Sequence, residues 1–290
     1  MDGWIAMRKW PLTLVYGCLI TGIFVPSAFS QWVEKPRQGW IQVALYHHDT
    51  TTRFDEQRNN ESLFNEGGRS ITTSVFLTGV IGVFEGVDVW VQAPFHRLEF
   101  NDVVEKRRST GVGDPRFHVR IDPFTIVGSS APFPLALRGG VKLKGQEFPV
   151  DSEIIPLTEG QRDWELILEL GHSFVPRPIY ARLWIGYRWR ESNTEVRKDP
   201  GNEFFYLASV GGALDEWNWK LSFEGLAGRP SHFFDIPIES SKREFFQILP
   251  NIGRSLGPGV LEIGGRFPLS GRNLPSGPAV FIGYFFRFSV

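Results

Sequence analysis

The most constraining feature of the sequence is a strand-length segment in which arginines alternate with apolar side chains. The segment Tyr180–Arg190 reads "YARLWIGYRWR" and carries Arg182, Arg188 and Arg190. The positions between them hold Leu183, Ile185, Tyr187 and Trp189. Successive side chains of a β-strand point to opposite faces of the sheet. One face of this strand therefore needs apolar surroundings, and the other needs water or counter-charges.

The same alternation with a period of two recurs along the chain, in segments of about ten residues. In "RDWELILELGHSF", for example, Trp164, Leu166 and Leu168 oppose Asp163 and Glu165. Helical periodicity is hard to find, and after the first thirty residues no run of 18 or more apolar residues occurs. Twelve strands are predicted, at 39–53, 69–83, 87–98, 113–122, 134–145, 161–174, 179–191, 202–214, 217–229, 243–255, 259–268 and 277–288.

The connections between these segments alternate in length. The short ones lie near Glu85 and at 175–178, 215–216 and 257–259, with a longer "DPFTIVGSSAPF" link among them. The long ones run over 54–68, 99–112, 146–160, 192–201, 230–242 and 269–276. An even strand number, alternating loop lengths and alternating faces are typical of an outer-membrane β-barrel. Eleven residues at ~3.3 Å each, tilted by ~45°, also span the ~25 Å apolar band of such a barrel.

We therefore predict an all-β fold, a closed antiparallel transmembrane β-barrel of twelve strands with short periplasmic turns and long external loops. A soluble β-sandwich also shows alternating faces. The polar faces here carry charges of both signs, as a wet lumen would. The apolar faces carry aromatic residues near strand ends, where a membrane-interface girdle is expected, namely Trp40, Trp164, Trp189, Trp217, Trp219 and Tyr284.

The N-terminus has the pattern of a secretory signal peptide. A basic "MRKW" precedes the apolar "PLTLVYGCLITGIFV", and small residues in "SAFS" precede Gln31. We predict a signal peptide over 1–30, cleaved at Ser30/Gln31, and an outer-membrane barrel over 31–290. Translation could begin at Met1 or at Met7. The single cysteine, Cys18, lies in the apolar run, which continues past it, so a lipoprotein site is the less favoured interpretation.

Charge and composition limit the function classes. The chain is 42% hydrophobic and 22% charged with a net charge of −1, which excludes a disordered chain and offers no electrostatic basis for nucleic-acid binding. The predicted inner faces carry many charges, among them Lys220 and Arg190. The candidate pore-lining residues are Arg120, Arg138, Lys142, Glu165, Glu169, Arg182, Arg188, Glu224, Glu262 and Arg266.

Two interpretations of these charges stay open. They could form salt bridges that brace the barrel, or they could line a pore and set its selectivity. Glu165 and Glu169 lie on the strand before the one that carries Arg182 and Arg188, so the sequence predicts pairs between them. Pro250 lies inside a predicted strand, where it indicates a bulge or a misplaced boundary.

Enzyme chemistry finds little support in the sequence. His172 and Ser173 are adjacent, so on a strand they point apart and cannot form a nucleophile–base pair. His47 and His48 diverge for the same reason, which favours rim histidines over a metal site. We expect no catalytic residue, metal or cofactor, and an outer-membrane lipid hydrolase is the least favoured alternative.

Three segments resemble a known family. "GVGDPRFHVRI" (Gly111–Ile121), "LRGGVKLKG" (Leu137–Gly145) and "LEIGGRFPLSGRNLPSGPAVFIGYFFRF" (Leu261–Phe288) are similar to segments of the outer-membrane barrel "transporter" family named for phenol meta-degradation. The resemblance implies a barrel that passes small solutes, often hydrophobic or aromatic ones. The family usually has Pro-Thr-Gly after Gly-Val-Lys-Leu, whereas this chain continues "KGQEFP", so the loop near Gln146 departs from the pattern.

The C-terminal segment "FIGYFFRFSV" resembles the recognition signal of the outer-membrane barrel assembly machinery, through Gly283, Phe286 and Phe288. Partners expected from the sequence are this machinery, outer-membrane lipid and a small-molecule solute. The predicted function is passive permeation of a small solute through an outer-membrane channel. The alternative is a non-conducting structural or adhesive barrel that acts through its external loops.

Overall fold

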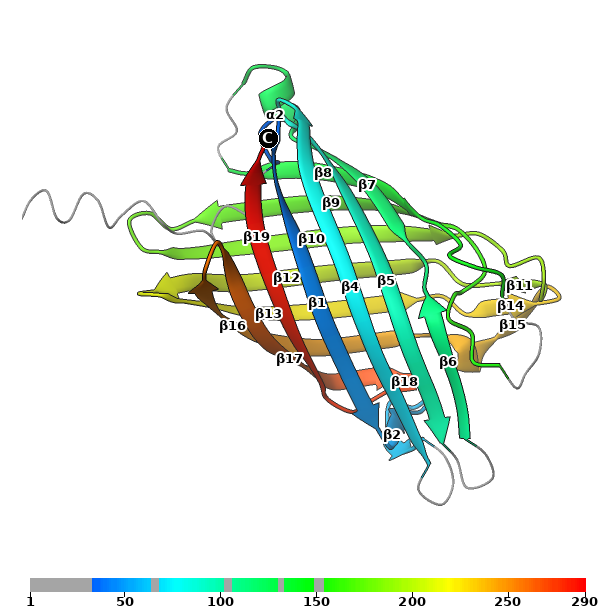
Figure 1. Ribbon diagram of the computed structural model, residues 1–290. Helices are drawn as coiled ribbons and strands as arrows, with labels where there is room; N and C mark the ends of the chain where they lie inside the picture. Colours follow the sequence, from blue (N-terminus) through cyan, green and yellow to red (C-terminus); the bar gives the residue numbers. More distant parts are fainter. Residues whose placement is uncertain (1–32, 64–67, 102–105, 130–132, 149–153) are drawn as a thin grey trace, which may run out of the picture.

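The computed structural model describes residues 33–63, 68–101, 106–129, 133–148 and 154–290, so the predicted signal peptide, 1–30, lies outside the described residues. The described chain forms an antiparallel sheet that closes into a barrel, because β1 pairs with both β19 and β4 (Figure 1). The barrel strands are β1 (Gln38–Thr50), β4 (Arg69–Phe84), β5 (Val87–Asn101), β6 (Lys106–Val112), β7 (Arg116–Ile121), β8 (Leu135–Lys142), β9 (Asp163–Ser173), β10 (Ile179–Arg190), β12 (Glu203–Leu214), β13 (Trp217–Gly228), β16 (Glu244–Leu256), β17 (Gly259–Arg272) and β19 (Ala279–Ser289).

The predicted twelve-strand barrel is confirmed. The sheet has thirteen strands, but β6 and β7 both pair with β5, one with each half of it, and so count as one interrupted barrel strand. The predicted segment 113–122 therefore starts too late, and much of the predicted loop 99–112 is strand.

The interruption between β6 and β7 falls at Gly113, Asp114 and Pro115, where Pro115 has no backbone N–H to donate to a ladder. The Asp114 carboxylate instead accepts hydrogen bonds from the backbone N–H groups of Gly145 and Glu159, each at 3.0 Å. The "GVGDP" segment thus anchors the connection between β8 and β9.

Long and short connections lie at opposite ends of the barrel. The turn end carries the described connecting residues 85–86, 122–129, 133–134, 174–178, 215–216 and 257–258, together with helix α2 (Pro123–Ile126) and the C-terminus (Figure 1). Gly86 has φ of +76°, a left-handed conformation that the tight β4–β5 turn requires and glycine readily adopts. The Asp122 side chain caps α2 by accepting from the N–H groups of Phe124 and Thr125.

The loop end carries the described connecting residues 51–63, 143–148, 154–162, 191–202, 229–243 and 273–278. Short strands within these loops form two small sheets. One sheet consists of β2 (Thr52–Phe54), β3 (Asn60–Ser62) and β18 (Leu274–Pro275). The other consists of β11 (Lys198–Asp199), β14 (Ser231–Phe233) and β15 (Ile236–Ile238), followed by the 3-10 turn η1 (Glu239–Ser241).

The predicted strand boundary around Pro250 is correct, since Pro250 lies inside β16 and pairs with Leu221 of β13. Towards β17 the register shifts between Phe246 and Gln247 and is unchanged from Ile248 to Asn251, so Pro250 itself does not mark a bulge.

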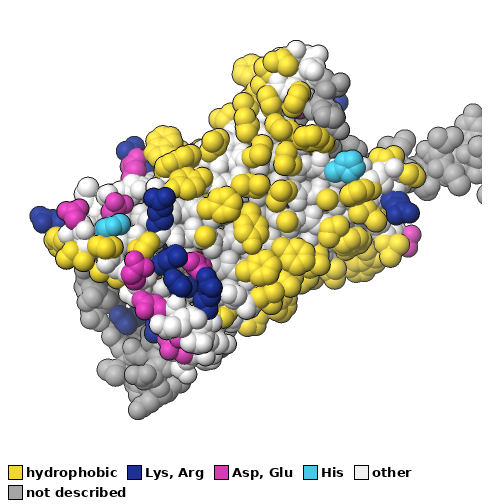
Figure 2. All heavy atoms as spheres, turned by 180° about the vertical axis from the view of Figure 1, so that it is seen from behind, with side chains coloured by type: hydrophobic (Ala, Val, Ile, Leu, Met, Phe, Trp, Pro, Cys, Tyr) yellow, Lys and Arg dark blue, Asp and Glu magenta, His cyan; other side chains and the backbone are white. Residues whose placement is uncertain are grey.

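The barrel is apolar outside and polar inside. Exposed side chains such as Leu77, Leu166 and Val280 cover its outer surface, while Asp88 and Arg120 inside are fully buried. Figure 2 shows the apolar side chains spread across the outer wall and charged side chains gathered towards one end. Among the described residues, no helix is long and apolar enough to cross a membrane.

The predicted aromatic girdle is correct in part. Trp164, Trp189 and Trp217 are among the exposed large side chains. Trp40 is not, because it is only 6% exposed and packs inside the barrel against Trp90, at 5.1 Å between ring centroids. The assignment of Trp40 to the outer face is therefore wrong.

Candidate functional site

All ten candidate pore-lining residues lie on the inner face of the barrel. Arg120 is on β7, Arg138 and Lys142 on β8, Glu165 and Glu169 on β9, Arg182 and Arg188 on β10, Glu224 on β13, and Glu262 and Arg266 on β17. The strands divide the interior into two parts. We call the inner faces of β5, β7, β8, β9, β10 and β12 the charged wall. We call those of β1, β4, β13, β16, β17 and β19 the amide wall.

The centre of the charged wall is a buried cluster of two arginines and two carboxylates. Arg120 lies 2.5 Å from Asp88 and 3.3 Å from Glu169, and Arg138 lies 2.8 Å from Glu169. All four side chains are at most 5% exposed. Because the two positive and two negative charges cancel, the cluster braces four neighbouring strands without presenting net charge to the lumen.

A second cluster forms around Glu165 towards the loop end. The predicted cross-strand pair with Arg188 is present at 2.7 Å, and His118 Nε2 lies 2.9 Å from the other carboxylate oxygen. Arg188 also contacts Glu203 of β12 at 2.6 Å. Gly140 makes this arrangement possible, since a Cβ there would lie 2.1 Å from the His118 ring. The predicted partner of Arg182 is wrong, because Glu169 faces Trp184 across the hairpin and turns to Arg120 and Arg138.

A third cluster ties a loop to the mouth of the barrel. Glu159, in the connection between β8 and β9, contacts Lys142, Arg190 at 2.5 Å and Arg243 at 3.5 Å. Burial alone would raise the pKa of Glu159, but the three cations, Arg190 foremost, hold that pKa well below its ordinary value. The carboxylate therefore stays charged and holds the loop between β8, β10 and the segment before β16.

Arginines and tryptophans alternate in a stack along the charged wall. The Arg138 guanidinium lies 4.6 Å from the ring centroid of Trp90 and 4.4 Å from that of Trp184. Arg120 extends the stack on Trp90 at 5.1 Å, and Arg182 ends it on Trp184 at 5.0 Å. These distances are within the range of cation–π attraction. The stack rigidifies the wall and leads from the paired arginines to Arg182.

The amide wall carries mostly uncharged polar groups. Gln92, which faces it from β5, donates to Thr78 at 3.1 Å, and Gln247 donates to Glu224 at 2.6 Å. Arg266, at 3.9 Å from Glu224, contributes a weak pair there. The bond between Gln92 and Thr78 joins two neutral groups, and such a bond is worth about 1 kcal/mol.

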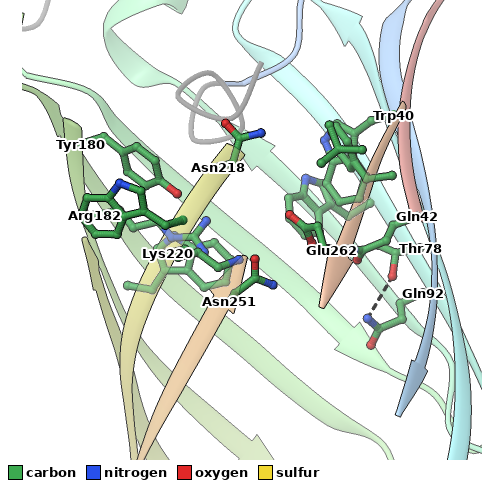
Figure 3. Close-up of a pocket in the computed structure, with 15 residues that line it drawn as sticks. Trp40, Gln42, Thr78, Gln92, Tyr180, Arg182, Asn218, Lys220, Asn251 and Glu262 are labelled. Carbon is green, nitrogen blue, oxygen red and sulfur yellow. Dashed lines mark hydrogen bonds between the residues drawn. The ribbon is translucent and has the colours of Figure 1, made fainter. Parts of the chain in front are cut away.

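Two adjoining cavities lie between the walls. The turn-end cavity has a volume of about 230 Å³ and is lined by Trp40, Gln42, Thr78, Trp90, Gln92, Tyr180, Arg182, Trp184, Asn218, Trp219, Lys220, Asn251, Val260, Glu262 and Phe285 (Figure 3). The middle cavity has about 260 Å³ and includes Arg116, His118, Arg138, Glu165, Arg188, Phe205 and Glu224. Both cavities share Trp90, Gln92 and Trp184, so they adjoin along the barrel interior.

Sequence reasoning missed the lumenal tryptophans. Trp90 has the same strand parity as Asp88, and Trp184 the same parity as Arg182, so the alternation itself could have placed both inside. Trp40 shares parity with the polar Gln42 and could have been found in the same way.

The histidines that the sequence singled out lie apart. His47 Nδ1 is 3.0 Å from the Thr73 hydroxyl, whereas His48 Nε2 is 3.0 Å from the Gly277 carbonyl. In the parts of the chain that the structure describes, no group of three or more His, Cys, Asp and Glu side chains could hold a metal ion.

No family model matches the chain, and no curated protein matches it. Among solved structures, the fold is similar to that of the COG4313 outer membrane channel from Pseudomonas putida F1, with a TM-score of 0.76 and 12% identity over 90% of this chain and 98% of that chain. It is also similar to the translocator domain of the autotransporter NalP from Neisseria meningitidis, with a TM-score of 0.50 and 9% identity over 95% and 97% of the two chains. At these identities the likeness shows the fold. The resemblance to the phenol meta-degradation family stays a prediction.

Proposed function

We propose that the protein is a bacterial outer-membrane channel through which a small solute permeates passively. The observation that carries the proposal is a polar interior with two adjoining cavities, enclosed by a barrel whose outer face is apolar. Such a barrel satisfies its backbone groups within the sheet, and its outer face suits lipid. The similarity to the COG4313 outer membrane channel supports the same function.

In this arrangement the turn end is periplasmic and the loop end is external, with both ends of the barrel segment on the periplasmic side. Two cavities restrict the route to small solutes, and six of the ten candidate residues line them, namely Arg138, Glu165, Arg182, Arg188, Glu224 and Glu262. Each cavity lies slightly below the ~300–1,000 Å³ that is usual for ligand pockets.

Single-channel recording of the purified protein in a planar bilayer tests the proposal. We expect discrete conductance steps whose preference for anions falls in Arg182→Glu. Insertion is verified separately, by protection from protease in liposomes. A protein that is folded and inserted but gives no steps would overturn the channel function.

The second candidate is a non-conducting barrel that acts through its loops. It is favoured by the contacts of Glu159 with Lys142, Arg190 and Arg243, which hold the residues around Glu159 at the mouth. If this alternative holds, the Glu159→Gln variant gives no conductance steps in the bilayer, and the substitution alters only the binding of partners to the external face.

We also propose that the C-terminal strand is read by the barrel assembly machinery. Gly283 pairs with both Ala44 and Glu262, while Phe286 and Phe288 alternate with inner-face residues and so point outwards. Replacing both phenylalanines by alanine should lower the amount of folded protein in the outer membrane. Unchanged assembly of the double variant would argue against recognition through these side chains.

A further inference from the structure

We propose that Arg182 and Lys220 form a binding subsite in the turn-end cavity for the anionic group of a small organic anion, such as a carboxylate. The inference rests on the proposed channel function and names the class of solute that the channel retains. It follows from three features of the cavity: unpaired cations, an excess of hydrogen-bond donors, and an apolar lining beside them.

The first feature is the state of the two cations. Arg182, from β10, and Lys220, from β13, both line the cavity and are half-buried (Figure 3). Among the described residues, neither side chain has an ion pair within 4 Å or a side-chain hydrogen bond, although Arg182 stacks on Trp184. This sets them apart from Arg138 and Arg188, whose guanidinium groups are held by carboxylates.

The second feature is the charge and donor balance. With two cations and the single carboxylate of Glu262, the lining of the cavity carries a net charge of +1. Gln42 donates a hydrogen bond to Glu262 at 3.3 Å, so the one carboxylate of the lining already has a partner. A cavity with walls of low dielectric concentrates this positive potential and favours an anion.

Four buried donors find no acceptor among the described residues: Arg182 Nε, Asn251 Nδ2, Trp40 Nε1 and Trp90 Nε1. They lie behind the cavity surface, so direct contacts with a ligand fall to the exposed ends of Arg182 and Lys220. Acceptor-rich anions match such a lining better than neutral or cationic solutes.

The third feature is the apolar surface next to the cations. Trp40, Val260 and Phe285 line the same cavity, and Trp40 packs on Phe285 with ring centroids 5.3 Å apart. A bare inorganic anion would leave this surface in contact with water. An anion with a compact apolar body covers it while its charged group meets Arg182 and Lys220.

Isothermal titration of the purified protein in detergent, with benzoate as the probe and in low-chloride buffer, tests the subsite without requiring conduction. We expect saturable binding that is about tenfold weaker for benzyl alcohol, which keeps the ring and lacks the charge. Arg182→Gln and Lys220→Gln should each weaken benzoate binding about tenfold, because each removes one charge-assisted contact. Glu262→Gln should tighten it severalfold by removing the opposing charge.

Arg254→Gln serves as the matched control, since Arg254 is exposed at the turn end and pairs with Glu216 outside the cavity. Equal affinity for benzoate and benzyl alcohol, or unchanged affinity in both cavity variants, would overturn the proposal. Competition by sulfate at the same concentration as benzoate would overturn the apolar part of it. Conductance steps from a protein that does not bind benzoate would overturn the subsite and leave the channel function intact. Benzoate binding by an inserted protein that gives no conductance steps would overturn the channel function and leave the subsite intact.

Discussion

The charged wall and the amide wall face the same interior, but they satisfy their polar groups in opposite ways. On the charged wall each of four carboxylates has a guanidinium within about 2.8 Å, namely Asp88, Glu165, Glu169 and Glu203. The amide wall relies instead mainly on hydrogen bonds from amide side chains, such as those of Gln92 to Thr78 and of Gln247 to Glu224. A charged side chain in a buried ion pair does not readily bind a solute instead, because breaking the pair would leave its buried partner unpaired. We therefore propose that the cations outside the clusters set the selectivity.

Two arginines on β10 give the sharpest test of this difference. Arg188 meets Glu165 at 2.7 Å and Glu203 at 2.6 Å, whereas Arg182 has no carboxylate within 4 Å among the described residues. Arg188→Glu would bring three carboxylates together in a buried site, so we expect no folded barrel. Arg182→Glu should fold and change ion preference.

The yield of folded protein is measured by the shift in gel mobility between unheated and boiled samples. Recovery of a folded Arg188→Glu barrel in wild-type amounts would show that the ion pairs of the charged wall are dispensable. Failure of Arg182→Glu to fold would remove the distinction between paired and unpaired cations.

The second prediction concerns the central cluster. Glu169→Gln removes the carboxylate shared by Arg120 and Arg138, and both guanidinium groups stay buried. Breaking a buried ion pair from one side costs about 3–5 kcal/mol. We expect a loss of that size in the free energy of unfolding, measured by urea titration in detergent or lipid. The exposed Glu216→Gln is the matched substitution and should leave the unfolding curve unchanged.

The third prediction concerns the pH dependence of the contacts that Glu159 makes at the mouth of the barrel. The pKa of Glu159 is lowered in the folded protein, so its stabilising contribution is complete above the ordinary value of 4.5 and is lost as the pH falls through the lowered pKa. Contacts with Lys142, Arg190 and Arg243 should thus hold at pH 7 and pH 5, and weaken only in stronger acid. Single-channel conductance should be constant between pH 7 and pH 5 and should rise in stronger acid.

Glu159→Gln separates this loop from the other titrating groups. The variant should show at pH 7 the higher conductance that the wild type reaches only in strong acid. A variant with wild-type conductance at neutral pH would mean that the loop does not obstruct the pathway.

The barrel could be predicted from the sequence because strand parity is a local property that survives errors in strand boundaries. Parity put all ten candidate residues inside, and hairpin adjacency predicted the pair of Glu165 with Arg188. Neither parity nor hairpin adjacency could decide between Arg182 and Arg138 as the partner of Glu169. That choice depends on the register across the 174–178 turn, which sets Trp184 opposite Glu169.

Cross-barrel contacts were beyond sequence reasoning for a different reason. The docking of Glu159 on Arg243 joins residues separated by 84 positions, through a loop without alternation. The interruption at Asp114 likewise depends on where that loop returns to the wall. The wrong placement of Trp40 was avoidable, since Ile41, Val43 and Leu45 form the apolar face of β1 and Trp40 lies with Gln42 on the other.

The fourth and smallest effect is expected on the amide wall. Thr78→Val keeps the shape of the side chain and removes the hydroxyl that accepts from Gln92 at 3.1 Å. A neutral hydrogen bond contributes about 1 kcal/mol, so the unfolding free energy should fall by about that amount. The loss should be several times smaller than that of Glu169→Gln in the same titration. Comparable losses from the two substitutions would mean that neutral and charged walls stabilise the barrel equally, and the division of labour between bracing and selectivity would have to be abandoned.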